Sequence, residues 1–412
     1  MNNFENIIQK KINRFLFFLV SSFIMIFGIN ASFFLFIPVF LSVVKNPRFE
    51  FFKFNSKYKI FSFLFALGAL LGTAKHFLSN SALLSNTLAV LPNYIYWTLI
   101  IFSIITIITK IKINQFSLFK IITTSVLFVS FYYLILQDFI SNPYFFKDFQ
   151  KNNFAFLIIT YAPYLVYYLK KKYSNTVSVF VFTLILMILL IEERRAGFVL
   201  TFIGGSLSYA VEKIKFTSIS NVFKLLLIPF FFLLFIQISP IKKIIQNSSP
   251  RVYGLIYEDN SKLNIDRSAL TRKAMVEKGL VLFNENIFFG VGLNNFTKVE
   301  ASITGNFEGA RFVIGKDIFE RTSSHNSYIN ILAEGGLFLA IPFGLILLFL
   351  IKDGFLYFNY LNTFDKVSFF SFLVMISHFY FMNSVVNSLA WLNIGLVASF
   401  LSKRINEIKR IN

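Results

Sequence analysis

The chain has 412 residues, of which 56% are hydrophobic and only 15% are charged, and phenylalanine alone accounts for 58. A soluble chain keeps about a quarter of its residues charged, so this composition excludes a soluble protein and predicts an all-α polytopic membrane protein. The formal net charge is +20. Cysteine is absent, which excludes disulfides, thiolate metal sites and cysteine nucleophiles.

The first residues do not have the pattern of a secretory signal. Residues 1–9 are largely polar, Lys10, Lys11 and Arg14 follow, and the next apolar stretch leads into further apolar runs without an Ala-x-Ala type of cleavage site. We therefore expect no cleavable signal peptide.

Apolar runs recur along most of the chain. Because about 17 to 25 apolar residues cross the hydrocarbon core of a bilayer, we predict about twelve transmembrane helices. They lie near residues 15–29, 31–44, 59–74, 90–109, 117–136, 154–169, 176–191, 196–211, 222–239, 328–351, 367–382 and 385–402. The short runs at the start are also compatible with a re-entrant hairpin.

The distribution of basic residues predicts the orientation. With both termini in the cytoplasm, the inside segments carry most of the Lys and Arg, whereas the short outside loops hold only Lys75, Lys147, Lys151, Arg194 and Arg195. This is the positive-inside pattern. Topology and attraction to anionic membrane lipids account for the net charge, so we expect no nucleic-acid partner.

The spans divide the chain into three parts. Residues 1–240 form the N-terminal membrane helices, residues 241–326 form one large extracytoplasmic loop, and residues 327–412 form the C-terminal membrane helices. A loop of this length inside a compact protein is usually functional or disordered. Its many aromatic and aliphatic residues argue against disorder.

Part of this loop is expected to be helical. Asp266 is a suitable N-cap for a helix that starts near Arg267, and Leu270, Ala274 and Val281 recur at helical spacing.

Four motifs follow one another in the second half of the chain. Residues 195–200 read Arg-Ala-Gly-Phe-Val-Leu at the outer start of a span, and Arg267 opens the helical stretch that continues to Phe283. Residues 286–296 read Asn-Ile-Phe-Phe-Gly-Val-Gly-Leu-Asn-Asn-Phe. Residues 325–336 begin with His-Asn-Ser-Tyr and end with Glu-Gly-Gly. His325 is one of only three histidines, and it lies where the long loop meets a predicted span.

The order and spacing of these motifs resemble those of the O-antigen ligase and polymerase superfamily of bacterial envelope glycosyltransferases, over roughly residues 180–350. The N-terminal half resembles the family only in topology. Two departures are visible. Ile287 replaces the proline usual in the third motif, and residues 192–195 read Glu-Glu-Arg-Arg where a Ser-Arg pair is commoner.

The resemblance implies a fold similar to that of other polyprenyl-dependent membrane glycosyltransferases, in the bacterial inner membrane with the active site facing outward. In the family, a glycan passes from undecaprenyl diphosphate to an acceptor hydroxyl, without a metal or other cofactor. The acceptor is a lipid A–core sugar in a ligase and a growing glycan in a polymerase.

This chemistry suggests roles for particular residues. Arginine binds phosphate oxygens with a planar fork and never loses its charge, so Arg195 and Arg267 are expected to hold the diphosphate as catalytic residues. Histidine titrates near neutral pH, so His325 is expected to deprotonate the acceptor hydroxyl. Arg194 and Arg272 are further candidates for the diphosphate.

Three further residues near the histidine are candidates for substrate binding. Asn326 and Tyr328 flank it, and Glu334 lies inside the predicted span, where an acidic group is costly and a functional candidate. We expect Glu334 to pair with an arginine or with His325.

Simpler interpretations exist for each site residue. His325 could simply cap the start of the following span, without a role in catalysis. Arg195 could anchor its helix to headgroup phosphates, and Arg267 could be an exposed residue in contact with water. Arg194 and Arg195 could exchange roles, and we favour Arg195 because two small residues follow it. We interpret His76 and His378 as structural.

The glycines of the third motif resemble a fragment of a dinucleotide-binding loop. Without a preceding strand or a third glycine, Gly290 and Gly292 are better explained as tight-turn residues.

Other classes of protein compete with a ligase or polymerase. One is a transferase of glycan to protein, and another is a polysaccharide transporter or flippase. Transporters typically have inverted repeats and helices broken near the middle of the membrane, and the sequence indicates neither.

Overall fold

The computed structural model describes residues 56–79, 83–110, 120, 123–124, 127, 151–191, 195–214, 267–305, 307, 313–314, 317–318 and 324–411. The predicted spans near 15–29, 31–44, 117–136 and 222–239 lie wholly or mostly outside these residues. So do Arg194 and the predicted boundary between the N-terminal helices and the long loop.

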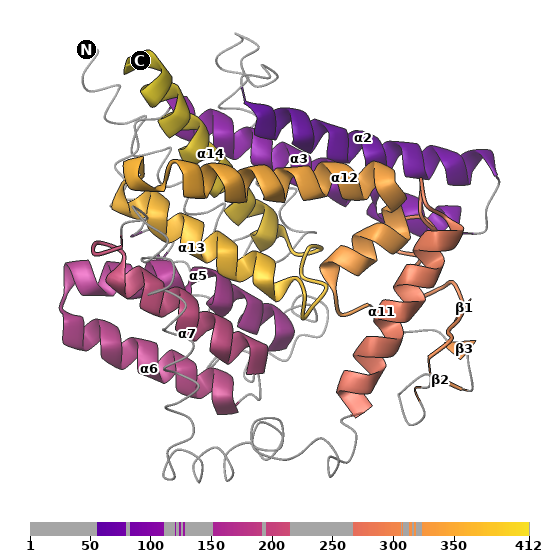
Figure 1. The fold of residues 1–412 in the computed structure, drawn as a ribbon, viewed down its shortest axis with the longest axis horizontal. Coiled ribbons are helices and arrows are strands. Elements are labelled where there is room, and N and C mark those ends of the chain that lie inside the picture. Colours follow the sequence, from indigo (N-terminus) through magenta and orange to yellow (C-terminus); the bar gives the residue numbers. More distant parts are fainter. Residues whose placement is uncertain are drawn as a thin grey trace, which may run out of the picture.

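The described part of the chain is almost entirely helical (Figure 1). In chain order its helices are α2 (Lys57–Leu78), α3 (Leu84–Lys110), α5 (Lys151–Lys172), α6 (Asn175–Ile191), α7 (Arg195–Ala210), α11 (Arg267–Glu285), α12 (Ser327–Leu356), the 3-10 turn η2 (Phe358–Tyr360), α13 (Thr363–His378) and α14 (Ser388–Ile411). The predicted spans in these regions each correspond to one of these helices, and the helix predicted from Arg267 is α11.

Three of the described helices are long and apolar enough to cross a membrane: α2, residues 84–106 of α3, and α12. The shorter helices α6 and α7 are also apolar. These lengths agree with a membrane protein, while the total of about twelve spans stays a prediction.

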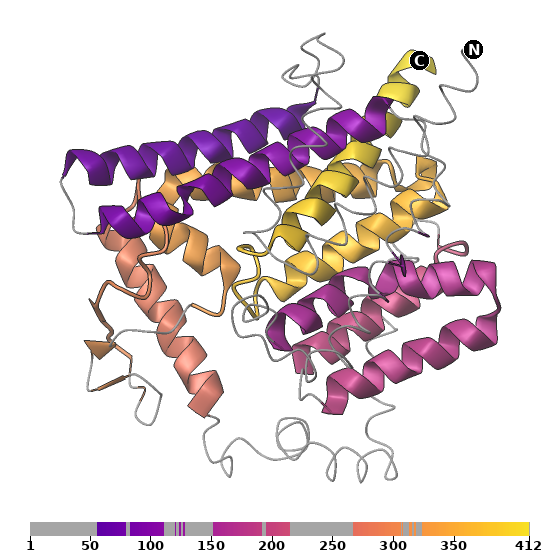
Figure 2. The same cartoon turned by 180° about the vertical axis from the view of Figure 1, so that it is seen from behind.

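Two groups of helices form the bundle. α2 packs against α3 and α12, and α14 packs against α3, whereas α5, α6 and α7 form a second group. α13 joins the two groups because it contacts α5, α7 and α14. Figure 2 shows the same arrangement from behind, with the pair α2 and α3 in front of α12.

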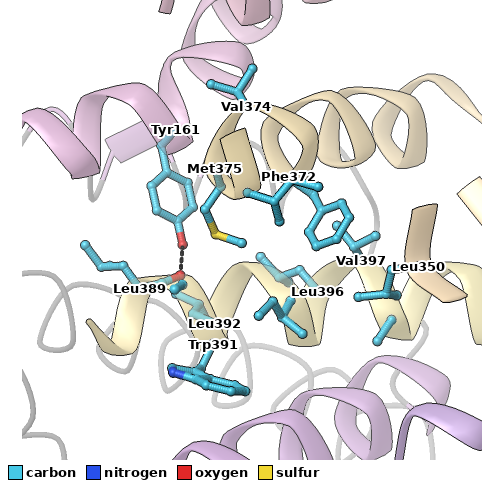
Figure 3. Close-up of a cluster of buried hydrophobic side chains, with 14 of the residues drawn as sticks. Tyr161, Leu350, Phe372, Val374, Met375, Leu389, Trp391, Leu392, Leu396 and Val397 are labelled. Atoms are coloured by element: carbon cyan, nitrogen blue, oxygen red, sulfur yellow. Dashed lines mark hydrogen bonds between the residues drawn. The ribbon is translucent and has the colours of Figure 1, made fainter. Parts of the chain in front are cut away.

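Large aromatic and aliphatic side chains fill the core between these helices. The indole rings of Trp97 and Trp391 stack with their centroids 5.3 Å apart, and Phe65 lies 4.8 Å from Trp391. Figure 3 shows the neighbouring part of the core, where Tyr161 donates a hydrogen bond of 3.4 Å to the carbonyl of Leu389. This bond gives the buried hydroxyl of Tyr161 the hydrogen-bond partner that a buried polar group needs.

Ion pairs gather the basic ends of several helices at one end of the bundle. Lys57 of α2 pairs with Asp353 of α12 at 2.5 Å, and Lys171 of α5 pairs with Glu212, just after α7, at 2.6 Å. Arg404 of α14 pairs with Asp365 of α13 at 3.6 Å. We call this end the basic end. It is the end that the positive-inside pattern predicts to be cytoplasmic.

A small antiparallel sheet lies beside α11. Its strands β1 (Ala301–Ser302), β2 (Val313–Ile314) and β3 (Asp317–Ile318) are arranged in the order β1-β3-β2. Ala301 and Val313 both pair with Ile318.

Candidate active site

The candidate site lies at the end of the bundle opposite the basic end. There α11, the loop 286–296 and the start of α12 come together, and α7 also begins at this end (Figures 1 and 2). A small core of buried apolar side chains joins the first three of these segments. It consists of Ala274, Met275, Leu282, Val291, Phe296, Ala301, Ile303 and Ala333.

α12 is broken inside its length. Gly336 has φ 58° and ψ −159° and divides α12 into two helical halves. This backbone conformation is accessible essentially only to glycine. The sequence indicated no broken helix, so this feature corrects our prediction of one continuous span near 328–351.

The loop 286–296 satisfies the backbone groups that the break exposes. The amides of Val291 and Gly292 donate to the carbonyls of Ala333 and Glu334 at 2.9 and 3.0 Å. In the other direction, the amides of Leu337 and Phe338 donate to carbonyls of the loop at 2.8 and 3.1 Å. A buried polar backbone group is costly without a partner, so the loop and the break stabilise each other.

Two glycines allow the loop to approach this closely. Gly290 and Gly292 both have positive φ, 67° and 93°. A Cβ atom at position 290 would lie 2.6 Å from the amide nitrogen of Gly335. The structure therefore confirms these residues as turn glycines that let the loop pack.

The break separates Glu334 from the part of α12 that is long enough to span a bilayer by itself. Residues 337–356 rise about 1.5 Å each and are long enough to cross the hydrocarbon core without the first half of α12. Glu334 precedes them and is buried among protein groups.

The carboxylate of Glu334 holds the loop in place. Its Oε1 accepts a hydrogen bond of 3.2 Å from the amide of Phe296. The amide of Asn294 and the side chain of Asn330 also donate to it. In the described part of the chain, these contacts replace the pairing with an arginine or with His325 that we expected.

His325 lies two residues before the start of α12, in an uncommon backbone conformation. Its φ is 49°, in the left-handed region, and its side chain is half-buried. Burial lowers the pKa of the imidazole below its ordinary value, and the nearby positive charge of Arg272 lowers it further. A lowered pKa favours the neutral imidazole, which is the form able to accept a proton.

The residues that flank His325 shape the start of α12. Asn326 is the N-cap, and its Oδ1 accepts hydrogen bonds from the amides of Tyr328 and Ile329 at 3.0 and 3.2 Å. The hydroxyl of Tyr328 donates to the carbonyl of Ile376 at 2.8 Å. Both side chains thus have structural roles, and substrate contacts by them stay a prediction.

The predicted arginines begin or lie on helices at this end. α7 begins at Arg195 and α11 begins at Arg267. Arg272, one turn further along α11, is exposed. The structure thus brings the charge of Arg272 close to His325, while the roles of Arg195 and Arg267 stay predictions.

The other two histidines are buried away from solvent. Nδ1 of His378 lies 3.0 Å from the hydroxyl of Ser384, and Phe156 packs 5.4 Å from its ring. His76 is buried at the end of α2 beneath Gly292. These surroundings agree with structural roles for both.

Two residues of the site were missed in the sequence. Ser324 and Asn330 are buried beside His325 and Glu334 and are hydrogen-bonded to each other. The i, i+4 spacing of Asn330 and Glu334 on a helix was the available signal.

Membrane-length helices and a site built from a broken helix, a loop and an exposed arginine define a helical membrane protein with a polar site at one end. Residues 154–344 match the family model described as O-antigen ligase. This match supports the O-antigen ligase and polymerase superfamily, as the four motifs predicted. No curated protein matches the chain.

Proposed function

We propose that this protein is a membrane glycosyltransferase that moves a glycan from undecaprenyl diphosphate to the hydroxyl of a lipid A–core sugar. The observation that carries the proposal is the half-buried His325, whose pKa is lowered by burial and by the charge of Arg272, within the residues that match the family. A base next to a phosphate-binding cation is the pair of groups that this reaction needs.

In the proposed reaction, Nδ1 or Nε2 of His325 takes the proton of the acceptor hydroxyl. The hydroxyl oxygen then forms a bond to the anomeric carbon, and the bond between that carbon and the diphosphate oxygen breaks. Undecaprenyl diphosphate leaves with the bonding electrons, and the proton passes from the imidazole to solvent or to the diphosphate.

The arginines are proposed to hold the leaving group. Arg195, Arg267 and Arg272 would bind the diphosphate oxygens and stabilise the charge that develops on them. Bound diphosphate would offset the charge of Arg272, and this would raise the pKa of His325 when the donor is in place. The base would then be strongest in the complex that reacts.

The second candidate is a polymerase that joins repeat units, because the matched family supports both activities. The two share a donor and differ only in the acceptor. Transfer of glycan to protein is a further variant with the same donor chemistry.

The broken helix α12 is the one observation that favours a transporter or flippase. In this protein, however, loop 286–296 pairs with the backbone groups at the break. These backbone groups are therefore already hydrogen-bonded within the protein and are not available to bind a transported substrate.

The glycan profile of a deletion strain tests the proposal. If the protein is a ligase, the strain accumulates long lipid-linked chains that are not attached to lipid A–core, and the wild-type gene restores attachment. A single repeat unit on the core would instead indicate a polymerase. An unchanged glycan profile would contradict both.

A further inference from the structure

The backbone at His325 needs to be held in place. A non-glycine residue with positive φ is uncommon, because its Cβ crowds the neighbouring carbonyl. At this position the conformation sets the direction in which the imidazole leaves the chain. Whatever holds the backbone therefore also fixes the direction in which the imidazole leaves the chain.

Ser324 hydrogen-bonds to both backbone polar groups of Asn326, the residue that follows His325. Its hydroxyl donates to the carbonyl of Asn326 at 2.7 Å and accepts from the amide of Asn326 at 3.2 Å. These two bonds close a small ring around His325. Ser324 itself is only 1% exposed, so water does not compete for its hydroxyl.

A chain of side chains connects Ser324 to the break in α12. The one hydroxyl proton of Ser324, donated mainly to the carbonyl of Asn326, is shared with Oδ1 of Asn330 at 3.4 Å. The side chain of Asn330 also bonds to Glu334. Glu334 in turn accepts from the amide of Phe296. All three side chains are buried, and buried polar networks with every member paired are rigid.

We propose that Ser324 is a positioning residue that fixes the imidazole of His325, supported by Asn330 and Glu334. Its importance for catalysis rests on the proposed function, but the positioning itself can be measured without substrate. The network makes the left-handed turn at His325 part of the same rigid unit as loop 286–296.

The experiment measures the titration of His325 in the full-length protein. With only three histidines in the chain, ¹³C-labelled imidazole gives a readable NMR spectrum in nanodiscs, and the His325→Ala spectrum assigns the resonance. In the wild-type protein, burial and Arg272 depress the pKa of His325. The Ser324→Ala variant frees the turn, so the imidazole moves toward water and its pKa rises.

The matched control is Ser62→Ala. Ser62 is also fully buried and its hydroxyl donates to a backbone carbonyl, that of Tyr58, at 2.7 Å. It lies in α2, away from the site, so the titration of His325 should be unchanged. A general loss of stability would affect both variants, whereas a change in positioning affects only Ser324→Ala.

Asn330→Leu provides a second variant if Ser324→Ala does not fold. It removes the link to Glu334 and leaves the two bonds to Asn326, so we expect a smaller rise in the same direction. An unchanged titration of His325 in whichever of these variants folds would overturn the proposal.

Activity assays separate this proposal from the proposed function. If His325→Ala loses transfer but Ser324→Ala keeps the wild-type rate and titration, the positioning role alone is wrong. If His325→Ala keeps full activity, the proposed function of the histidine is wrong, whatever the titration of Ser324→Ala shows.

Discussion

Gly336 and Gly290 meet backbone to backbone at the break in α12. A Cβ atom at position 336 would lie 2.6 Å from the amide nitrogen of Gly290. At this distance the two segments would have to move apart and give up hydrogen bonds between loop 286–296 and the two halves of the helix. The contact therefore ties the shape of α12 to that of the loop.

We expect Gly336→Ala to destabilise the protein by about 2 kcal/mol or more, since the new methyl group meets both a clash and an unfavourable φ. The loss of stability is measured as a fall in melting temperature, with thermal unfolding of the purified protein monitored by size-exclusion chromatography. Gly344→Ala is the matched control in the same helix, because no atom lies within 4 Å of the added Cβ. Equal melting temperatures for the two variants would contradict the close contact.

His325→Ala should reduce glycan transfer by about 100-fold or more, because the acceptor hydroxyl loses its general base. Glycan display is measured relative to the amount of protein in the membrane. His378→Asn is the control, since that histidine is buried against Ser384, and it should keep most of the activity. In the variant His325→Gly the backbone keeps its left-handed conformation, which glycine adopts readily, and the space of the side chain is left empty. Imidazole added to the solution should therefore act as the base there and partly restore activity. Normal display by His325→Ala would remove the histidine from the mechanism.

Arg272→Gln should move the pH dependence of transfer. The charge of Arg272 disfavours the protonated imidazole and lowers the pKa of His325, so removing the charge raises this pKa. Activity requires the neutral imidazole and is lost as pH falls through its pKa. The loss in the variant should therefore begin at a higher pH than in the wild type. The adjacent, exposed Lys273 supplies the control Lys273→Gln, for which a comparable shift would argue against a specific effect of Arg272.

Transfer should continue in the presence of EDTA. The proposed mechanism stabilises the diphosphate with arginines, whose charge does not depend on a metal. The measurement is transfer by purified protein in liposomes, with lipid-linked donor extracted from the deletion strain, before and after chelation. Complete loss of activity that added Mg²⁺ or Mn²⁺ restores would show that a divalent ion takes part.

The site should be accessible from outside the cell. Because the chain contains no cysteine, single cysteines can be introduced without a background. Glu300→Cys, near the loop, should react with an impermeant maleimide in intact spheroplasts, and Asn406→Cys, at the basic end, should react only after permeabilisation. Both original residues are exposed. The opposite labelling pattern would reverse the predicted topology.

Local patterns predicted those parts of the fold that depend on local sequence. The start of α11 at Arg267 followed from apolar residues at helical spacing and a suitable cap. Asn326 immediately before an apolar run is also a recognisable N-cap, although we considered it only as a substrate contact.

The break in α12 could not be predicted in this way. Gly335 and Gly336 do not interrupt the hydropathy of the run, so the segment has the composition of one span. The break is stabilised by hydrogen bonds to loop 286–296. In the sequence this loop is separated from α12 by the residues that contain the small sheet. The partners of Glu334 were missed for the same reason, because they are backbone amides of that loop.

The broken helix has a consequence for how the protein is made. Leu337 and Phe338 begin the half of α12 that can cross the bilayer, and their amides pair with carbonyls of residues synthesised earlier. In lipid an unpaired amide costs several kcal/mol. With the predicted topology, which places the loop outside, we therefore expect the loop to be translocated before this half-helix settles in the membrane. On that topology, export of the loop and insertion of residues 337–356 would be one coupled step of biogenesis.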